Sequence, residues 1–206
     1  MDNLLNTNYI NYINKEYRPF EPPCIPLNIG EIKSDVINDT YFDIQDMQKA
    51  IKQPVGKGSA TYKNITNKII AIIDYEDFIK KLPLNNTKDM KRCDFIVYDL
   101  EQYSFFVLNE LSQSSSSKNK FSDARQQLHN AIFHFNKVYE IKSFVNKFNE
   151  KLCVFSNKNK TLTKTPENIA DAFDEVKKYL PEPIEHNYQP ITKLNFKLIE
   201  AAIIDV

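Results

Sequence analysis

Two carboxylates, Asp94 and Glu110, flank a stretch of the chain that is otherwise strongly apolar. Asp94 stands near the start of the run CDFIVYD, and Glu110 lies near the end of the run FFVLNELS. An unpaired carboxylate in apolar surroundings is costly, so each acid needs a partner. Carboxylate oxygens are the ligands that magnesium and manganese prefer, and such an ion activates water and neutralises charge on a phosphate. If the fold brings the two acids together, they predict a divalent-metal site.

The residues that carry the two acids predict a β-hairpin over 93–112. β-branched and aromatic residues fill both runs, and a short loop at 101–103 joins them. With the loop centred on Gln102, Asp94 lies directly opposite Glu110, and side chains alternate between the two faces of each strand. The acids then share a face with Ile96, Tyr98, Phe106, Leu108 and Ser112. Like charges directly opposed across two strands are destabilising, which favours a cation between them.

Two other arrangements use the same residues without a metal. A register shift of one residue places the acids on opposite faces of the hairpin. Alternatively, Asp94 caps the start of its strand while Glu110 pairs with a cation at the rim, namely Lys91, Arg92 or Lys120. The sequence leaves these arrangements open.

Periodicity predicts helices and further strands around the hairpin. We expect helices over 40–53, 66–82 and 165–180 and one long helix beginning at Ser122, with a turn at 54–59. The run IIAII at 69–73 fits a buried strand as well as the helix that we favour. Residues 151–157 read as a strand, and 193–206 as a strand or short helix. This order predicts an α/β or α+β domain with a central mixed sheet flanked by helices.

The N-terminal part of the chain has a different composition. Four prolines between Pro19 and Pro26 predict an extended, irregular segment. We therefore expect a Pro-rich N-terminal arm over 1–35 and a single domain over 36–206.

Bulk composition narrows the class of protein. The chain has 206 residues with 42% hydrophobic content, enough to bury a core. Lys+Arg and Asp+Glu both number 27, so the overall charge favours no partner, although a local basic patch could bind nucleic acid. Three cysteines without a C-x-x-C pair indicate reduced thiols. With no signal-peptide pattern and no apolar run of membrane-spanning length, we expect a cytoplasmic protein without a membrane partner.

The runs CDFIVYD and FFVLNELS, followed by a helix that contains DARQQL, resemble the PD-(D/E)xK nuclease superfamily over about residues 66–156. The resemblance implies a restriction-endonuclease-like αβββαβ core. It also implies that Asp94 and Glu110 bind Mg or Mn and that Gln127 supports the site from the following helix. Glu76 corresponds to an additional acid that some members carry on the first helix.

The chain departs from the family pattern at Ser112, where the family has a lysine. That lysine orients the attacking water and offsets transition-state charge, an effect worth several kcal/mol. Lys118 or Lys120, in the segment after the strand, could replace it. The resemblance implies a metal-dependent nuclease acting on DNA or RNA with Asp94, Glu110, Ser112, Gln127 and Lys120 in its site. The alternative is a non-catalytic nuclease-fold domain that binds a protein or nucleic acid. Self-association into a homo-oligomer through the N-terminal arm is a third hypothesis.

Overall fold

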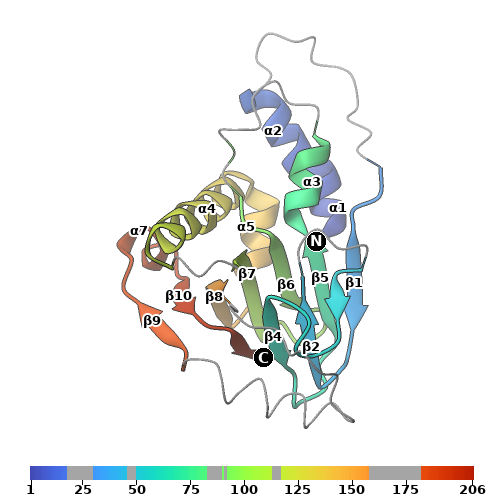
Figure 1. Ribbon diagram of the computed structural model, residues 1–206. Coiled ribbons are helices and arrows are strands. Elements are labelled where there is room, and N and C mark those ends of the chain that lie inside the picture. The colour runs from blue at the N-terminus through green and yellow to red at the C-terminus, as the bar shows by residue number, and fades with distance from the viewer. Residues whose placement is uncertain (18–29, 46–49, 83–89, 91, 113–116, 158–181) are drawn as a thin grey trace.

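The computed structural model describes residues 1–17, 30–45, 50–82, 90, 92–112, 117–157 and 182–206. A seven-stranded mixed sheet has the order β1-β5-β6-β7-β8-β10-β9, and a four-stranded sheet has the order β11-β4-β2-β3 (Figure 1). In the large sheet the strands are β1 (Ser34–Ile37), β5 (Ile70–Asp74), β6 (Phe95–Asp99), β7 (Phe105–Ser112), β8 (Glu150–Asn157), β10 (Lys197–Glu200) and β9 (Ile184–His186). In the small sheet they are β2 (Tyr41–Ile44), β3 (Lys52–Gln53), β4 (Ala60–Lys63) and β11 (Ile203–Asp205).

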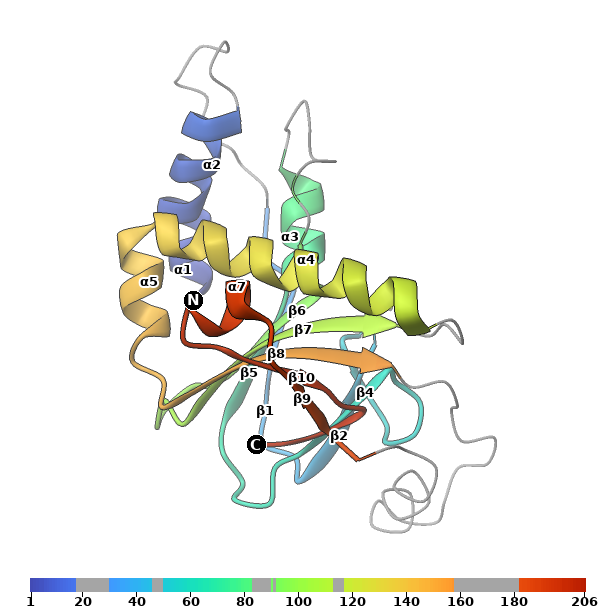
Figure 2. The ribbon, with the colours of Figure 1, turned by 90° about the vertical axis from the view of Figure 1, so that its left-hand side faces the viewer.

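The described helices pack mainly on one face of the large sheet. They are α1 (Asp2–Leu4), a π-helical turn η1 (Leu5–Tyr9), α2 (Ile10–Tyr17), α3 (Tyr75–Lys81), α4 (Ser117–Lys137), α5 (Tyr139–Val145) and α7 (Gln189–Thr192). Figure 2 shows α4 running across the strands of the large sheet, with the small sheet lying below them. The mixed α/β architecture that the sequence predicts is confirmed, but with two sheets instead of one.

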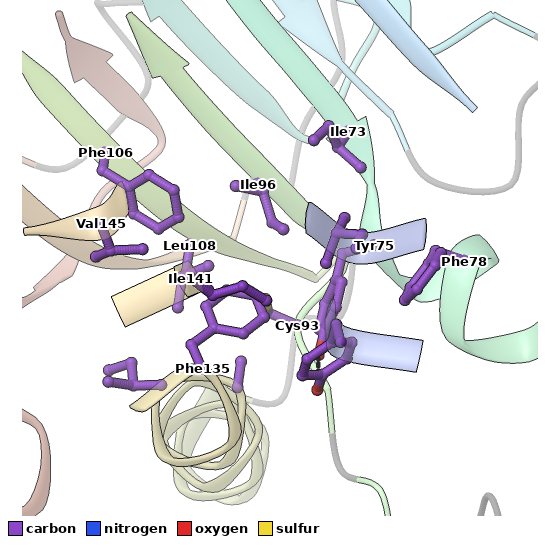
Figure 3. Close-up of a cluster of buried hydrophobic side chains, with 14 of the residues drawn as sticks. Ile73, Tyr75, Phe78, Cys93, Ile96, Phe106, Leu108, Phe135, Ile141 and Val145 are labelled. Carbon is purple, nitrogen blue, oxygen red and sulfur yellow. Dashed lines mark hydrogen bonds between the residues drawn. The ribbon is translucent and has the colours of Figure 1, made fainter. Parts of the chain in front are cut away.

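Each face of the large sheet has its own hydrophobic core. The helix-side core joins the N-terminal helices, α3, α4 and α5 to the sheet and includes Tyr9, Tyr75, Phe78, Ile96, Phe106, Leu108 and Phe135. Figure 3 shows part of it, with Tyr75, Phe78 and Phe135 converging below Ile96 and Leu108. The sheet-side core packs the small sheet on the opposite face and includes Phe42, Ile44, Tyr62, Ile72, Phe95, Val97 and Val107. Strict alternation along β6 and β7 assigns their side chains to one core or the other.

The predicted hairpin is confirmed, together with its register. β6 and β7 pair antiparallel with Ile96 opposite Leu108 and Tyr98 opposite Phe106. All four of these side chains belong to the helix-side core. After β7 the chain passes through α4 and α5 and returns as β8, which pairs with β7 in parallel.

The prediction of an extended N-terminal arm is wrong for residues 2–17, which are helical. Leu5, Tyr9 and Ile13 recur at a spacing of four, and all three are fully buried in the helix-side core. The packing of this apolar stripe overrides the irregular character that the neighbouring prolines suggest. The proposed boundary at 35/36 falls inside β1, which pairs with β5. The prolines at 18–29 lie outside the described residues.

The helix expected over 40–53 is also wrong, because residues 41–44 form β2 and residues 52–53 form β3. Ile44 and Ile51 lie on facing segments, where the Gln45 amide donates to the Ile51 carbonyl at 3.2 Å. Both side chains enter the sheet-side core. The apolar spacing that resembles a helix in the sequence therefore arises from two chain segments that face each other. The turn at 54–59 is confirmed.

The segment over 66–82 divides into strand and helix. Residues 70–74 form β5, buried between β1 and β6, and α3 begins directly after Asp74, whose carboxylate accepts the Asp77 amide at 2.9 Å. The continuous apolar run suits a strand that is buried on both faces, so the helix expected there is wrong for 70–74.

Four further expectations concern the C-terminal half. The long helix begins at Ser117, five residues earlier than expected, and a break at Val138 separates α5 from it. The strand over 151–157 is confirmed, and 193–206 contains two strands, β10 and β11. The helix expected over 165–180 lies outside the described residues.

Candidate functional site

Asp94 and Glu110 lie at the open end of the β6–β7 hairpin. The ladder ends at the Phe95–Asn109 pair, so the predicted opposition of Asp94 and Glu110 falls one residue beyond it. The Asp94 amide donates to the Asn109 carbonyl at 3.1 Å. Asp94 and Glu110 are only 7% and 8% exposed, so both acids lie in a setting with little access to water.

Part of the alternative arrangement for Asp94 is also present. Its Oδ2 accepts the backbone amide of Leu111 at 2.7 Å, so this carboxylate holds the strand that follows Glu110. Asp94 therefore fixes the end of β7 through this bond.

The thiol of Cys93 lies close to both acids. Burial raises the pKa of Cys93 well above its ordinary value, and the negative charges of Glu110 and Asp94 raise it further. The thiol is fully buried, and its sulfur donates weakly to the Phe95 carbonyl at 3.8 Å. A thiol held neutral in this way is not a nucleophile, so the chemistry available at this end of the hairpin belongs to the carboxylates.

Glu76, Arg92 and Gln127 form a second layer beside Asp94. The Glu76 amide donates to the Asp94 carbonyl at 3.1 Å, and a Glu76 carboxylate oxygen lies 3.4 Å from the Arg92 guanidinium. The Gln127 side-chain amide, from α4, donates to the Arg92 carbonyl at 3.1 Å. The structure thus brings the sequence-predicted residues Glu76 and Gln127 to the segment that leads into Asp94, although neither is shown to touch the carboxylate pair itself.

Ser112 and Lys120 have different environments. Ser112 ends β7 at 7% exposure, two residues beyond Glu110 and therefore on the same face of the strand. Lys120 is exposed in the first turns of α4. Lys118 lies in α4, but its side chain is outside what the structure describes. That a lysine of this segment replaces the one missing at Ser112 stays a prediction.

The donor set near Asp94 and Glu110 suits one kind of metal binding. Within the described ranges, no group of three or more His, Cys, Asp or Glu side chains is arranged to hold a metal ion. A closed, all-protein site is therefore absent from this part of the chain. Magnesium commonly binds through one or two carboxylates, several waters and substrate phosphate, so a buried carboxylate pair fits an ion that is completed by its substrate.

The sequence analysis missed two buried residues, Asn109 and Tyr62, that support the strand carrying Glu110. Asn109, directly before Glu110, accepts a hydrogen bond from Tyr62 at 3.0 Å and donates to the Val154 carbonyl and to Ser156, each at 3.0 Å. Asn109 therefore ties β7 to β8 and to the small sheet. A fully polar asparagine inside the apolar run FFVLNELS was the available signal, since buried amides occur where they are hydrogen-bonded.

Comparisons with protein-family models, with curated proteins and with solved structures gave no match for this chain. In the described part of the chain, no helix has the length and apolar character needed to cross a bilayer.

Proposed function

We propose that this chain is a divalent-metal-dependent nuclease-like protein that hydrolyses phosphodiester bonds in DNA or RNA. The observation that carries the proposal is that Asp94 and Glu110 are both buried at one end of the β6–β7 hairpin, where both act on the Cys93 thiol. Carboxylate oxygens that gather in this way are the donors that magnesium and manganese prefer.

The order of elements around the pair supports the same proposal. β5, β6 and β7 form an antiparallel meander, α4 and α5 follow, and β8 returns parallel to β7. This order agrees with the βββαβ part of the restriction-endonuclease-like core that the resemblance implies, with Asp94 just before the second strand and Glu110 near the end of the third. Helix α2 precedes the meander in the chain and packs in the helix-side core. Glu76 lies on α3, between the first and second strands of the meander, so it does not stand on the first helix as the resemblance implies.

In this proposal each residue has a defined part. Asp94 and Glu110 supply the metal-binding oxygens, and a bound Mg or Mn ion would polarise the phosphate and lower the pKa of a coordinated water. The backbone bond from Leu111 fixes the Asp94 carboxylate, and the Asn109 hydrogen bonds fix the strand that carries Glu110. Gln127 holds the segment before Asp94 through the Arg92 carbonyl. Ser112 contributes a hydroxyl but no charge, so a cation must come from elsewhere.

A second candidate is a non-catalytic nuclease-fold domain that binds a protein or a nucleic acid. Ser112 in place of the family lysine favours it, as does the presence of only two carboxylates at the described site. The two candidates share the fold but differ in chemistry, and fold alone does not decide function.

Titration of manganese into the wild-type protein, Glu110→Ala and Asp94→Asn by calorimetry, without and then with a short DNA duplex present, tests the proposal. We expect stoichiometric binding in the wild type and its loss in both variants. Glu101→Ala is the matched control, because Glu101 is exposed in the loop at the other end of the same hairpin. Circular dichroism confirms that each variant folds.

The calorimetric result directs the next assay. A nuclease is supported by two results together. Metal binding depends on both acids, and the wild type cleaves labelled DNA or RNA whereas Glu110→Ala does not. If the wild type binds metal but cleaves neither, the non-catalytic candidate is favoured. Metal affinity that is retained in Glu110→Ala and Asp94→Asn would rule out the proposed site.

A further inference from the structure

The guanidinium of Arg92 is partly buried but held by weak contacts. Its Nη1 donates to the Met90 carbonyl at 3.3 Å, and its Nη2 lies 3.4 Å from a Glu76 oxygen. Charge-assisted N–H···O bonds are ordinarily about 2.7–2.9 Å long, so both contacts are longer than such bonds. The Arg92 Nε is buried and has no hydrogen-bond partner within the described part of the chain. Arg92 therefore has donors to spare in a site that is largely shielded from water.

The location of Arg92 links it to the carboxylate pair. Arg92 stands two residues before Asp94, and the Gln127 amide fixes its carbonyl at 3.1 Å. Glu76, the acid that faces the guanidinium, donates its own backbone amide to the Asp94 carbonyl. The positive charge of Arg92 also lowers the pKa of the buried Tyr75, although burial as the largest influence raises it overall. The guanidinium thus lies at the first turn of α3, beside Glu76, whose backbone amide bonds the Asp94 carbonyl.

A second cation already neutralises Glu76. Lys80, one helical turn further along α3, forms a close ion pair with the other Glu76 oxygen. Glu76 therefore keeps a partner when Arg92 turns away from it. A charged residue whose counter-ion is already satisfied is suited to bind an incoming anion, since little is lost in the exchange.

We propose that Arg92 binds a substrate phosphate at this site and supplies the positive charge that Ser112 cannot. The inference rests on the proposed function, in which the substrate is a nucleic-acid phosphodiester. A guanidinium is always charged and presents a planar fork of donors that matches two phosphate oxygens. Arg92 would hold the phosphate next to Asp94 and Glu110, opposite in charge to both. The chain thereby takes its cation from the segment before Asp94 instead of from the end of β7.

Binding of a short labelled DNA duplex, measured by fluorescence anisotropy with calcium as the divalent ion, tests the proposal. Loss of one charge-assisted contact in Arg92→Gln should weaken binding about ten-fold or more. The slope of log K against log salt should also fall by about 0.9, the value for one lost phosphate contact on duplex DNA. Lys81→Gln is the matched control, because it removes one positive charge from the same helix, where Lys81 pairs with Asp77 and not with Glu76, and it should leave affinity and slope close to wild type.

A conservative variant guards against a purely structural effect. Arg92→Lys keeps the charge without the fork, so it should bind DNA more tightly than Arg92→Gln and less tightly than the wild type. If Arg92→Gln does not fold, the intermediate affinity of Arg92→Lys carries the test. Equal losses in Lys81→Gln and Arg92→Gln would overturn the proposal, because the effect would then come from the lost positive charge in general and not from a contact made by Arg92.

Manganese titration of the same variants separates this inference from the proposed function. We expect Arg92→Gln to keep the metal stoichiometry of the wild type. If the wild type binds no manganese but its DNA binding depends on Arg92, the phosphate site is supported and the nuclease is rejected. Metal-dependent DNA cleavage that Arg92→Gln leaves unchanged would reject Arg92 alone, and a wild type that binds neither DNA nor RNA would reject both.

Discussion

The Tyr62 hydroxyl on β4 donates a hydrogen bond of 3.0 Å to the side-chain oxygen of Asn109 on β7, and both residues are fully buried. This bond crosses from the small sheet to the large one. Because Asn109 also bonds β8 and immediately precedes Glu110, the small sheet takes part in fixing the carboxylate pair. Buried polar groups that are fully satisfied in this way rigidify the strands that carry them.

Replacing Tyr62 with phenylalanine should destabilise the protein by about 1–3 kcal/mol, because the Asn109 oxygen then lacks its donor in a dry interface. The ring still stacks on Phe42, at a centroid distance of 5.1 Å, so little packing is lost. Urea denaturation measures the change. In the double variant Tyr62→Phe, Asn109→Leu, the unsatisfied oxygen is absent, and the effect of the tyrosine substitution should be smaller. An unchanged unfolding free energy for Tyr62→Phe would mean that this bond contributes nothing.

The hairpin and its register could be predicted because local rules determine them. Two β-rich runs joined by a short loop leave few pairings, and the alternation of side chains then places Asp94 and Glu110 on one face. The role of Asn109 could not be predicted in the same way. Its partner Tyr62 lies on the small sheet, whose strands β2 and β3 fall in the segment 40–53 that periodicity predicts as a helix. The bond between Tyr62 and Asn109 therefore depends on long-range strand pairing, which periodicity does not reveal.

The involvement of Arg92 was hidden for a related reason. Glu76 faces Arg92 only because the chain changes from strand to helix at Asp74. A single helix over 66–82 places Glu76 among isoleucines and gives it no cation. The change depends on a capping carboxylate and on β5 pairing with β1 and β6, and only the cap is local in sequence.

Truncation of Tyr9 should show that the N-terminal helices belong to the fold. Tyr9 packs on Tyr75, Phe78 and Phe135, and its hydroxyl lies 2.6 Å from that of Tyr75. Tyr9→Ala should lower the unfolding free energy by about 3–5 kcal/mol, as for other large aromatic truncations in a core. Tyr139→Ala is the control, since Tyr139 is 77% exposed and should change stability by no more than about 0.5 kcal/mol. Similar values for the two variants would contradict the packing of residues 2–17.

Gly58 is required by close contact with the backbone. A Cβ at this position would lie 2.5 Å from the Ile44 carbonyl oxygen and 2.7 Å from the Asp43 Cβ, in a turn where the Gly58 amide donates to Asp43 at 2.8 Å. Gly58→Ala should therefore destabilise by about 1–3 kcal/mol, the usual cost of overpacking. Gly30→Asn is the control, because Gly30 has φ +71° and open space around it, and asparagine tolerates that conformation. Thermal denaturation that gives the two variants equal midpoints would contradict the contact.

His134 should make the stability of the protein depend on pH. Its Nδ1 and Nε2 lie 3.0 Å and 3.2 Å from the hydroxyls of Tyr12 and Tyr17, so the ring joins α4 to α2. Burial lowers the pKa of His134 from its ordinary 6.5; nearby Glu16 opposes the shift and Lys137 adds to it.

Because the pKa is lower in the folded protein, the unfolded chain binds more protons as the pH falls below 6.5. Stability is therefore full above this value and is lost progressively toward the lowered pKa. His129, whose pKa burial also lowers, contributes in the same direction, so His134→Gln should remove part of the dependence and His129→Gln a separate part. Urea midpoints at about pH 5 and about pH 7.5 measure this, since glutamine cannot charge and can still bond a tyrosine hydroxyl. The urea midpoint of the wild type should differ between the two pH values. If His134→Gln shows the same difference, protonation of His134 is not coupled to folding.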